Sequence, residues 1–165
     1  MLSHLIDLPE SFRHGVPAPT PARRAIKTFR HSIDIYLKDS NAYGNTYFSR
    51  YFEWQGVCRE RWFHQCISAD MLQSLGVFIT KRAHAEYLHE SFPFQHLTCE
   101  VNTHEIRHCS FQLLFRFVSE ERTVATGYQQ IAFADHRKRL QRLPAFALNR
   151  MRDYEVMDTT PFERG

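Results

Sequence analysis

Alternating apolar and polar residues mark the first regular element of the chain. In residues 28–37, TFRHSIDIYL, the apolar side chains Phe29, Ile33, Ile35 and Leu37 occupy odd positions and polar residues lie between them. Successive side chains of a strand point to opposite faces, so this spacing predicts a strand with one buried face. The polar stretch KDSNAYGN, residues 38–45, is expected to end it as a turn.

A long buried helix is predicted from residue 45 to residue 74, with Gly76 as its stop. Apolar residues surround this helix on nearly every side, which is typical of a helix in the middle of a fold. Gly56 lowers helix propensity by about 1 kcal/mol relative to alanine, so we expect it to serve a close approach to another backbone. The apolar residues are Tyr47, Phe48, Tyr51, Phe52, Trp54, Val57, Cys58, Trp62 and Phe63.

Four further strands are predicted at residues 77–89, 96–107, 109–118 and 122–134. The third has the clearest alternation, with Phe111, Leu113, Phe115 and Phe117 on one face. SEER, residues 119–122, predicts a tight turn that joins the last two strands into a hairpin. One strand, one long helix and four consecutive strands predict an α+β domain in which a curved antiparallel sheet wraps around the helix.

Length and composition fit a single domain. The chain has 165 residues, of which 43% are apolar, enough to bury a core. Residues 28–146 contain all the predicted elements. Residues 1–27, which carry four prolines, are expected to form an extended lead-in, and residues 147–165 a C-terminal tail.

The charge pattern argues against a nucleic-acid binder, because the net charge is only +3 and 18 acidic residues are interspersed among 21 basic ones. One basic run, HRKRLQR at residues 136–142, stands out. It is either a solvated segment after the last strand or a contact for the phosphates of coenzyme A or for an acidic carrier protein.

The cysteines and the apolar runs bear on location. The four cysteines, Cys58, Cys66, Cys99 and Cys109, show no paired spacing, and no signal sequence is evident, so we expect reduced thiols in a cytoplasmic protein. No apolar run approaches the roughly 20 residues that cross a bilayer. The sequence therefore predicts a protein that does not associate with membranes.

HEIRH, residues 104–108, matches the H-E-x-x-H zinc motif. That motif needs a helix, which brings both histidines to one metal. Here it lies in a stretch with the alternation of a strand, where residues four apart are separated by about 13 Å. A metal site is therefore not predicted.

The stretch NAYGNTYFSRYFEWQGVCRE, residues 41–60, together with the order of elements, resembles the hotdog-fold thioesterases of the 4-hydroxybenzoyl-CoA thioesterase family. Within that family it is most similar to the thioesterases of enediyne polyketide biosynthesis, and RLP at residues 142–144 adds to the likeness. The resemblance covers about residues 28–146. The matching positions are Asn41, Gly44, Asn45, Tyr47, Tyr51, Trp54, Gln55, Gly56, Cys58, Arg59 and Glu60.

The resemblance implies a homo-oligomer, a dimer or a homotetramer, in which two sheets join and the acyl chain lies at the interface beside the helix. It implies neither a cofactor nor a metal. Backbone N–H groups of Gly44 and Asn45, at the start of the helix, would hold the oxyanion that forms at the thioester carbonyl. Many relatives carry an aspartate at the position of Asn41, whose neutral amide can orient water or the carbonyl but cannot take a full proton.

The resemblance also implies roles along the helix. Arg59 would anchor carbonyls of the substrate, Tyr51 would donate its hydroxyl, and Tyr47, Gln55 and Glu60 would contact the substrate. Other interpretations remain open at this point: Tyr51 as a core residue, Arg59 as an ion-pair partner of Glu60, and the turn residues Asn41 and Gly44 as purely structural. The nearest carboxylate, Asp39, is then an alternative base.

The function implied is hydrolysis of an acyl thioester, with a polyketide or β-ketoacyl chain on an acyl carrier protein as the expected substrate. One alternative is an acyl-CoA thioesterase of general metabolism. Another is a non-catalytic hotdog module that binds an acylated partner, an interpretation that the missing aspartate leaves open.

Overall fold

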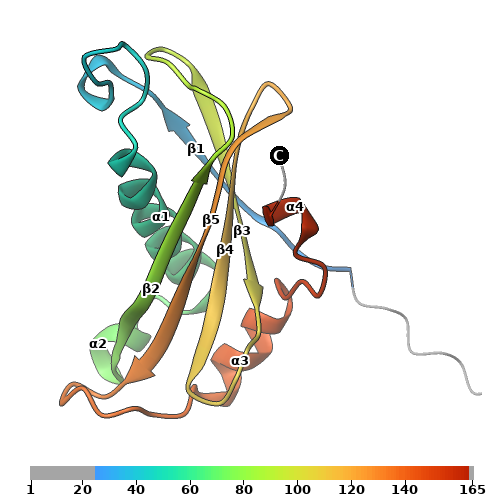
Figure 1. The fold of residues 1–165 in the computed structure, drawn as a ribbon. Helices are drawn as coiled ribbons and strands as arrows, with labels where there is room; N and C mark the ends of the chain where they lie inside the picture. Colours follow the sequence, from blue (N-terminus) through green and yellow to red (C-terminus); the bar gives the residue numbers. More distant parts are fainter. Residues whose placement is uncertain (1–24, 164–165) are drawn as a thin grey trace, which may run out of the picture.

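A five-stranded antiparallel sheet organises the protein (Figure 1). The computed structural model describes residues 25–163, so the predicted lead-in lies almost entirely outside the described residues. The strands lie in the order β1-β3-β4-β5-β2, which makes β1 and β2 the edges. Their bounds are β1 Phe29–Asp34, β2 Val77–Tyr87, β3 His96–His104, β4 Ser110–Ser119 and β5 Arg122–Ala134.

The alternation in the sequence predicts these strands correctly. In β4 the odd-numbered phenylalanines and Leu113 are buried, while Gln112 and Arg116 on the other face are partly exposed. β5 has the predicted bounds, whereas β2 and β3 end two or three residues earlier than expected. The hairpin turn is also confirmed: Glu120 and Glu121 have φ of 48° and 67°, the left-handed pair of a type I′ turn that matches the twist of the flanking strands.

The long helix is shorter than predicted at both ends. α1 runs over Ser49–Trp62, a π-helical turn continues it over Phe63–Ile67, and the separate short helix α2 spans Met71–Ser74. It begins late because the backbone N–H of Thr46 donates to Ser91 O (2.8 Å) and the chain around Thr46 is extended. It ends early because Ser68 is extended, with φ −162°.

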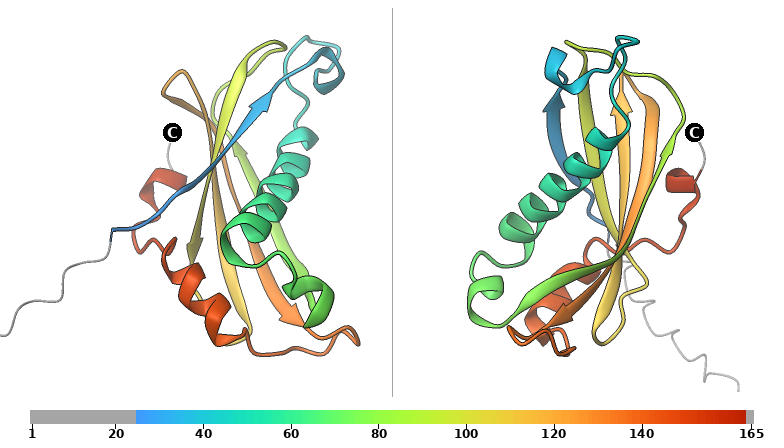
Figure 2. Two further views of the ribbon diagram at one scale, coloured as in Figure 1. Left: turned by 180° about the vertical axis from the view of Figure 1, so that it is seen from behind. Right: turned by 60° about the vertical axis from the view of Figure 1, so that its left-hand side comes forward.

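Only one side of α1 packs on the sheet. Tyr51, Gln55, Cys58 and Trp62, spaced three or four residues apart, are buried against the concave face. The rest of its surface is uncovered in the single chain (Figure 2). The aromatics Phe48 and Phe52, which flank the buried side, are exposed. The prediction of a helix enclosed on all sides is therefore wrong for one chain, because the sheet wraps around half of it.

The C-terminal segment belongs to the folded domain. Residues 145–163, which include most of the tail expected at residues 147–165, form α3 (Ala145–Arg152) and α4 (Thr160–Glu163). Ala147 and Met151 of α3 are completely buried in the same core as Trp62. α4 lies across the sheet from α1 (Figure 1), where it contacts β4 and β5.

The HEIRH segment forms no helix. His104 is the last residue of β3, its Nδ1 lies 2.8 Å from Val156 O, and Glu105 turns the chain with φ 45°. Within residues 25–163, no cluster of three His, Cys, Asp or Glu side chains is arranged to hold a metal ion. All four cysteines are unpaired thiols. Among the described helices, none is both long and apolar enough to span a membrane.

The basic run lies in an exposed loop after β5. Asp135 organises the start of that loop: its Oδ1 accepts the backbone N–H groups of Arg137 and Arg139, each at 2.9 Å. These bonds and the Arg139 guanidinium lower the pKa of the Asp135 carboxyl. The loop thus presents the basic side chains to solvent, at the end of the sheet next to α2 and α3 (Figure 1).

Candidate active site

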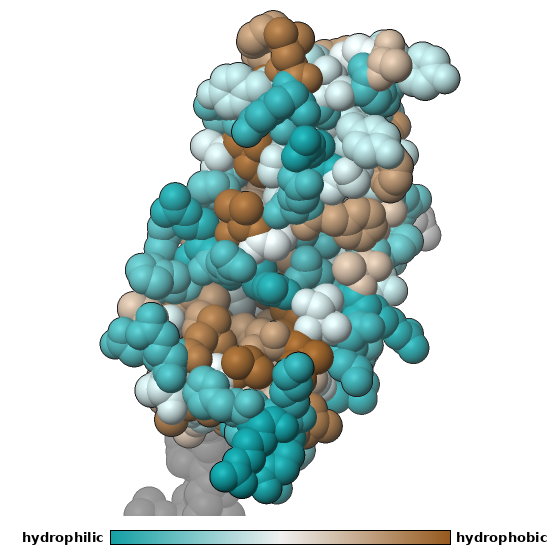
Figure 3. All heavy atoms as spheres, turned by 90° about the vertical axis from the view of Figure 1, so that its left-hand side faces the viewer, coloured by the Kyte–Doolittle hydropathy of each residue, from teal (hydrophilic) through white to brown (hydrophobic). Residues whose placement is uncertain are grey.

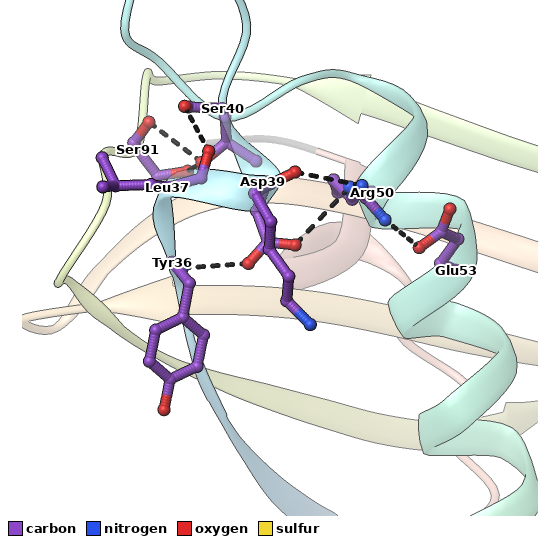
Figure 4. A network of polar contacts seen from close by, with 9 residues as sticks. Tyr36, Leu37, Asp39, Ser40, Arg50, Glu53 and Ser91 are labelled. Carbon is purple, nitrogen blue, oxygen red and sulfur yellow. Dashed lines mark hydrogen bonds and ion pairs between the residues drawn. The ribbon is translucent and has the colours of Figure 1, made fainter.

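A folded loop, residues 36–47, leads from β1 into α1 and is held by one buried carboxylate (Figure 4). Asp39 is 4% exposed. Its Oδ2 accepts the N–H of Tyr36 at 2.9 Å, and its Oδ1 lies 3.5 Å from Nε of Arg50 in the first turn of α1. Its backbone oxygen accepts the N–H of Tyr47 at 2.8 Å. Asp39 therefore fixes the loop to the helix, and both carboxylate oxygens already have partners.

Asn41 and Gly44 form a tight turn at the tip of this loop. Asn41 Oδ1 accepts the N–H of Tyr43 at 2.8 Å, and Asn41 O accepts the N–H of Gly44 at 3.0 Å. Gly44 has φ 85°, a conformation that glycine adopts without strain. The turn precedes the first residue of α1 by five positions. Gly44 and Asn45 thus lie before α1. The prediction that they belong to the first turn of the helix is wrong.

A pocket of about 320 Å³, here called the N-terminal pocket, opens between this loop, the start of α1 and residues 87–91 at the end of β2 and just after it. It brings together four predicted site residues: Asn41, Asn45, Tyr47 and Tyr51. The side-chain amide of Asn45 donates to Glu90 Oε1 at 2.8 Å, while its Oδ1 is buried without a hydrogen-bond partner among the described residues. The Asn45–Glu90 bond therefore ties two walls of the pocket together.

Tyr51 forms one wall of the N-terminal pocket but is itself 3% exposed. Its hydroxyl lies 2.7 Å from Ser91 Oγ, which in turn donates to Thr46 Oγ1 at 2.7 Å. Burial raises the pKa of the Tyr51 phenol, so the hydroxyl keeps its proton. Its ring packs edge-on against Phe117 with centroids 5.1 Å apart. Tyr51 is thus a core residue that also closes the pocket.

Arg59 lies two turns further along α1 and does not line the N-terminal pocket. Its guanidinium donates to Thr80 Oγ1 at 2.7 Å and to Gln129 Oε1 at 3.0 Å. Burial lowers the pKa of Arg59, which still leaves a guanidinium charged at neutral pH. Among the described residues Arg59 and Glu60 form no close ion pair, although the exposed Glu60 carboxylate acts against burial by raising the pKa of Arg59.

A buried line of amides holds Arg59 in place. Gln129 Nε2 donates to Gln55 Oε1 at 3.3 Å, and Gln55 Nε2 donates to His84 O at 2.9 Å. Gln55 and Gln129 are 0% and 4% exposed, so neither touches solvent. Gly127 makes room for this line, because a Cβ there would lie 2.3 Å from the Gln55 amide nitrogen. Gln55, a predicted substrate contact, instead supports Arg59 from the core.

A second pocket of about 200 Å³, here called the apolar pocket, lies beside Arg59. Its lining is mostly hydrophobic. On the face of the molecule that carries α1, apolar side chains gather near the lower end of the view (Figure 3). Glu60 lies at its rim. The lining residues are Arg59, Glu60, Phe63, Leu72, Val77 and Phe78.

Several residues of these sites were not predicted from the sequence, among them Gln129, Glu90 and Ser91. Gln129 had a detectable signal, because it is a polar residue at a core-facing position of an alternating strand, between Gly127 and Ile131. Glu90 and Ser91 had none. They lie in a loop whose position opposite residues 41–46 depends on the pairing of distant strands.

The thioesterase-like superfamily matches residues 35–158. The dynemicin thioesterase has a similar fold, with a TM-score of 0.73, 20% identity, and 80% of this chain and 100% of that chain covered. A sequence comparison with curated proteins found no significant match.

Two further solved structures share the fold. One is a 1,4-dihydroxy-2-naphthoyl-CoA thioesterase from Synechocystis, with a TM-score of 0.68, 14% identity, and 77% of this chain and 97% of that chain covered. The other is a Staphylococcus aureus protein solved in complex with CoA, with a TM-score of 0.72, 14% identity, and coverages of 78% and 84%. These likenesses establish a hotdog fold.

Proposed function

The chain belongs to the thioesterase-like superfamily and is a thioester hydrolase, and we propose that it releases a long polyketide or β-ketoacyl chain from an acyl carrier protein. The N-terminal pocket would hold the thioester group. Asn41 Nδ2 and the N–H of Asn45 are the donors available there to the carbonyl oxygen, since the N–H of Gly44 is bonded within the turn. Such donors stabilise the charge that develops on that oxygen.

The observation that carries the proposal for a long chain is an apolar stripe along α1. Phe48, Phe52, Gly56, Arg59 and Phe63 follow one another at intervals of three or four residues, so they share one side of the helix. Phe48 lines the N-terminal pocket, and Arg59 and Phe63 line the apolar pocket. From Phe48 to Arg59 the stripe spans about 16 Å along the helix axis.

Gly56 has a distinct place in this stripe. A Cβ at this position would meet nothing within 4 Å, so the predicted close approach to another backbone is not made by the described residues of the same chain. The glycine instead leaves a gap between Phe52 and Arg59 over which a flexible chain can pass. Carbonyls of a polyketide chain would then reach the guanidinium of Arg59, which agrees with its predicted role as an anchor.

A second copy of the chain is part of the proposal. β2 is an edge strand of 11 residues, and no described strand pairs with its outer edge. Such an edge offers unpaired N–H and C=O groups to another strand. Pairing there would join two sheets and bring a partner towards the exposed side of α1. We therefore propose a homodimer, alone or as half of a homotetramer, in which the acyl chain is enclosed at the interface.

Gly56→Leu tests the path of the acyl chain. Leucine is a good helix former and the position is open, so the fold is expected to remain intact. We expect turnover of a long acyl thioester to fall at least tenfold, and turnover of a short one to remain within twofold. Gly56→Ala is the matched control, expected to stabilise the helix by about 1 kcal/mol with a small effect on chain length. Equal loss on both substrates would contradict the proposed path.

The choice of thiol is tested with the wild-type protein. Matched acyl groups are presented on a carrier protein and on CoA, and the exposed basic loop, residues 136–142, is available to the phosphate of either. Faster hydrolysis from the carrier protein is expected. A strong preference for CoA would favour a thioesterase of general metabolism. The fold shared with a CoA thioesterase is consistent with that alternative. Absence of hydrolysis from both would favour an acyl-binding module.

A further inference from the structure

The N-terminal pocket has no base among the residues that the sequence indicates. Asn41 is neutral, and its carbonyl oxygen already accepts the N–H of Tyr43 at 2.8 Å. Asp39 is buried, is bonded through both oxygens and does not line the pocket. Hydrolysis of a thioester by water is accelerated by a group that accepts the proton of that water. That group has to come from another part of the chain.

Glu90 is the carboxylate that lines this pocket. Its Oε1 accepts the side-chain amide of Asn45 at 2.8 Å, and its Oε2 accepts no hydrogen bond from the described residues. The side chain is exposed, so water has access to it. The lining also contains a histidine, His89. Its Nδ1 lies 2.7 Å from the guanidinium of Arg122. Glu90 is therefore the group in the lining with a free acceptor oxygen and a net negative charge.

The backbone next to Glu90 is fixed relative to the loop that carries Asn41. Ser91 O accepts both the N–H of Thr46 (2.8 Å) and its hydroxyl (3.0 Å). Ser91 Oγ bonds to Thr46 Oγ1 and lies within 2.7 Å of the hydroxyl of Tyr51. Ser91 is 1% exposed. These bonds hold the segment after β2 against the loop before α1, so the carboxylate and the amides face one pocket.

We propose that Glu90 is the general base of the hydrolysis, an inference that rests on the function proposed above. A water molecule attacks the carbonyl carbon of the thioester while Glu90 Oε2 takes one of its protons. The new C–O bond forms as the carbonyl π electrons move to the oxygen, which the Asn41 and Asn45 donors hold. The C–S bond then breaks, the sulfur leaves with its electron pair, and the proton passes from Glu90 to the sulfur. The products are a carboxylic acid and a free thiol.

Glu90→Gln isolates the basicity of this side chain. Glutamine has the same shape, and its carbonyl oxygen can still accept the hydrogen bond of the Asn45 amide, but it cannot take a proton from water. General-base catalysis contributes roughly 10²-fold or more to a rate. We expect kcat on an acyl-CoA or acyl-carrier thioester to fall at least 100-fold, with KM within threefold of the wild type.

Glu86→Gln is the matched control. Glu86 is an exposed glutamate four residues earlier, on the face of the sheet opposite α1, and its removal is expected to leave kcat within twofold. A second variant, Glu90→Ala, is assayed with added formate. A small carboxylate can replace a missing base in the space left by the side chain, so we expect formate to restore kcat at least fivefold in Glu90→Ala and not in the wild type.

The outcomes separate the two proposals. Wild-type hydrolysis with an unaffected Glu90→Gln overturns the role of Glu90 and leaves the proposed function standing. A slow Glu90→Gln whose Glu90→Ala counterpart gains nothing from formate also overturns it, because the side chain would then act only by positioning Asn45. A wild-type protein that hydrolyses no thioester removes both proposals.

Discussion

The two sides of α1 differ in what they require from the rest of the molecule. On the side that faces the sheet, Gln55, Cys58 and Trp62 are completely buried, and every polar atom of Gln55 is bonded. On the other side, Phe48 and Phe52 are 53% and 37% exposed, and Gly56 is bordered by open space. The same helix thus has one surface that packs against the sheet and one that remains exposed in the single chain.

This difference indicates which residues serve stability and which serve binding. Isolated exposed apolar residues are common on protein surfaces. Phe48 and Phe52 are exposed on the part of α1 that leads from the N-terminal pocket towards the apolar pocket, which favours a role in binding. Arg59 lies between the two sides. Its guanidinium donates to buried Gln129, and the residue also lines the apolar pocket. Substitutions on the sheet-facing side are therefore expected to lower stability, and substitutions at Phe52, Gly56 and Arg59 of the stripe to lower activity.

The largest effect is expected at Trp62. Its ring is 0% exposed and lies among Phe63, Phe111 and Tyr154, with centroids between 6.0 and 6.3 Å away. Trp62→Ala removes these contacts and leaves a cavity, which typically costs about 3–5 kcal/mol of unfolding free energy. Urea denaturation followed by circular dichroism measures it. A loss below about 1 kcal/mol would show that this side of α1 contributes less than its burial indicates.

An intermediate effect is expected at Arg59. Arg59→Ala should lower turnover at least tenfold, about 1.4 kcal/mol of transition-state stabilisation, with the oligomer intact. Arg61→Ala, an exposed arginine of the same helix, is the control and should retain full activity. Rates are compared under conditions where both variants are fully folded. Unchanged turnover in Arg59→Ala would remove Arg59 from the mechanism and confine the site to the N-terminal pocket.

The smallest effect on stability is expected at Phe52. Phe52→Ala should change the unfolding free energy by less than about 1 kcal/mol, because the ring is partly exposed and alanine favours the helix. In the same variant, kcat/KM for a long acyl thioester should fall severalfold, and that for a short one should not. If kcat/KM fell equally for both substrates, the stripe would have no role in chain selection.

Several features of the structure follow from local patterns. The alternation in residues 111–117 specifies β4, and SEER specifies its hairpin, because strand period and turn type depend on neighbouring residues. The motif in residues 41–60 locates the turn of Asn41 and the start of the N-terminal pocket. It does not reveal that Arg59 lies outside this pocket, because that depends on the distance along a helix whose ends are set by Thr46 and Ser68.

The sequence by itself determined the strands and the segment that carries the site, since each is encoded within a few consecutive residues. The order of these elements then determined the α+β architecture with a curved antiparallel sheet. Tertiary structure alone decided that Glu90 faces Asn45, that Gln129 holds Arg59, and that residues 145–152 complete the core. These contacts join positions 45 or more residues apart. They exist only because strand pairing and burial bring those positions together. The spacing of apolar residues along the chain does not predict such contacts.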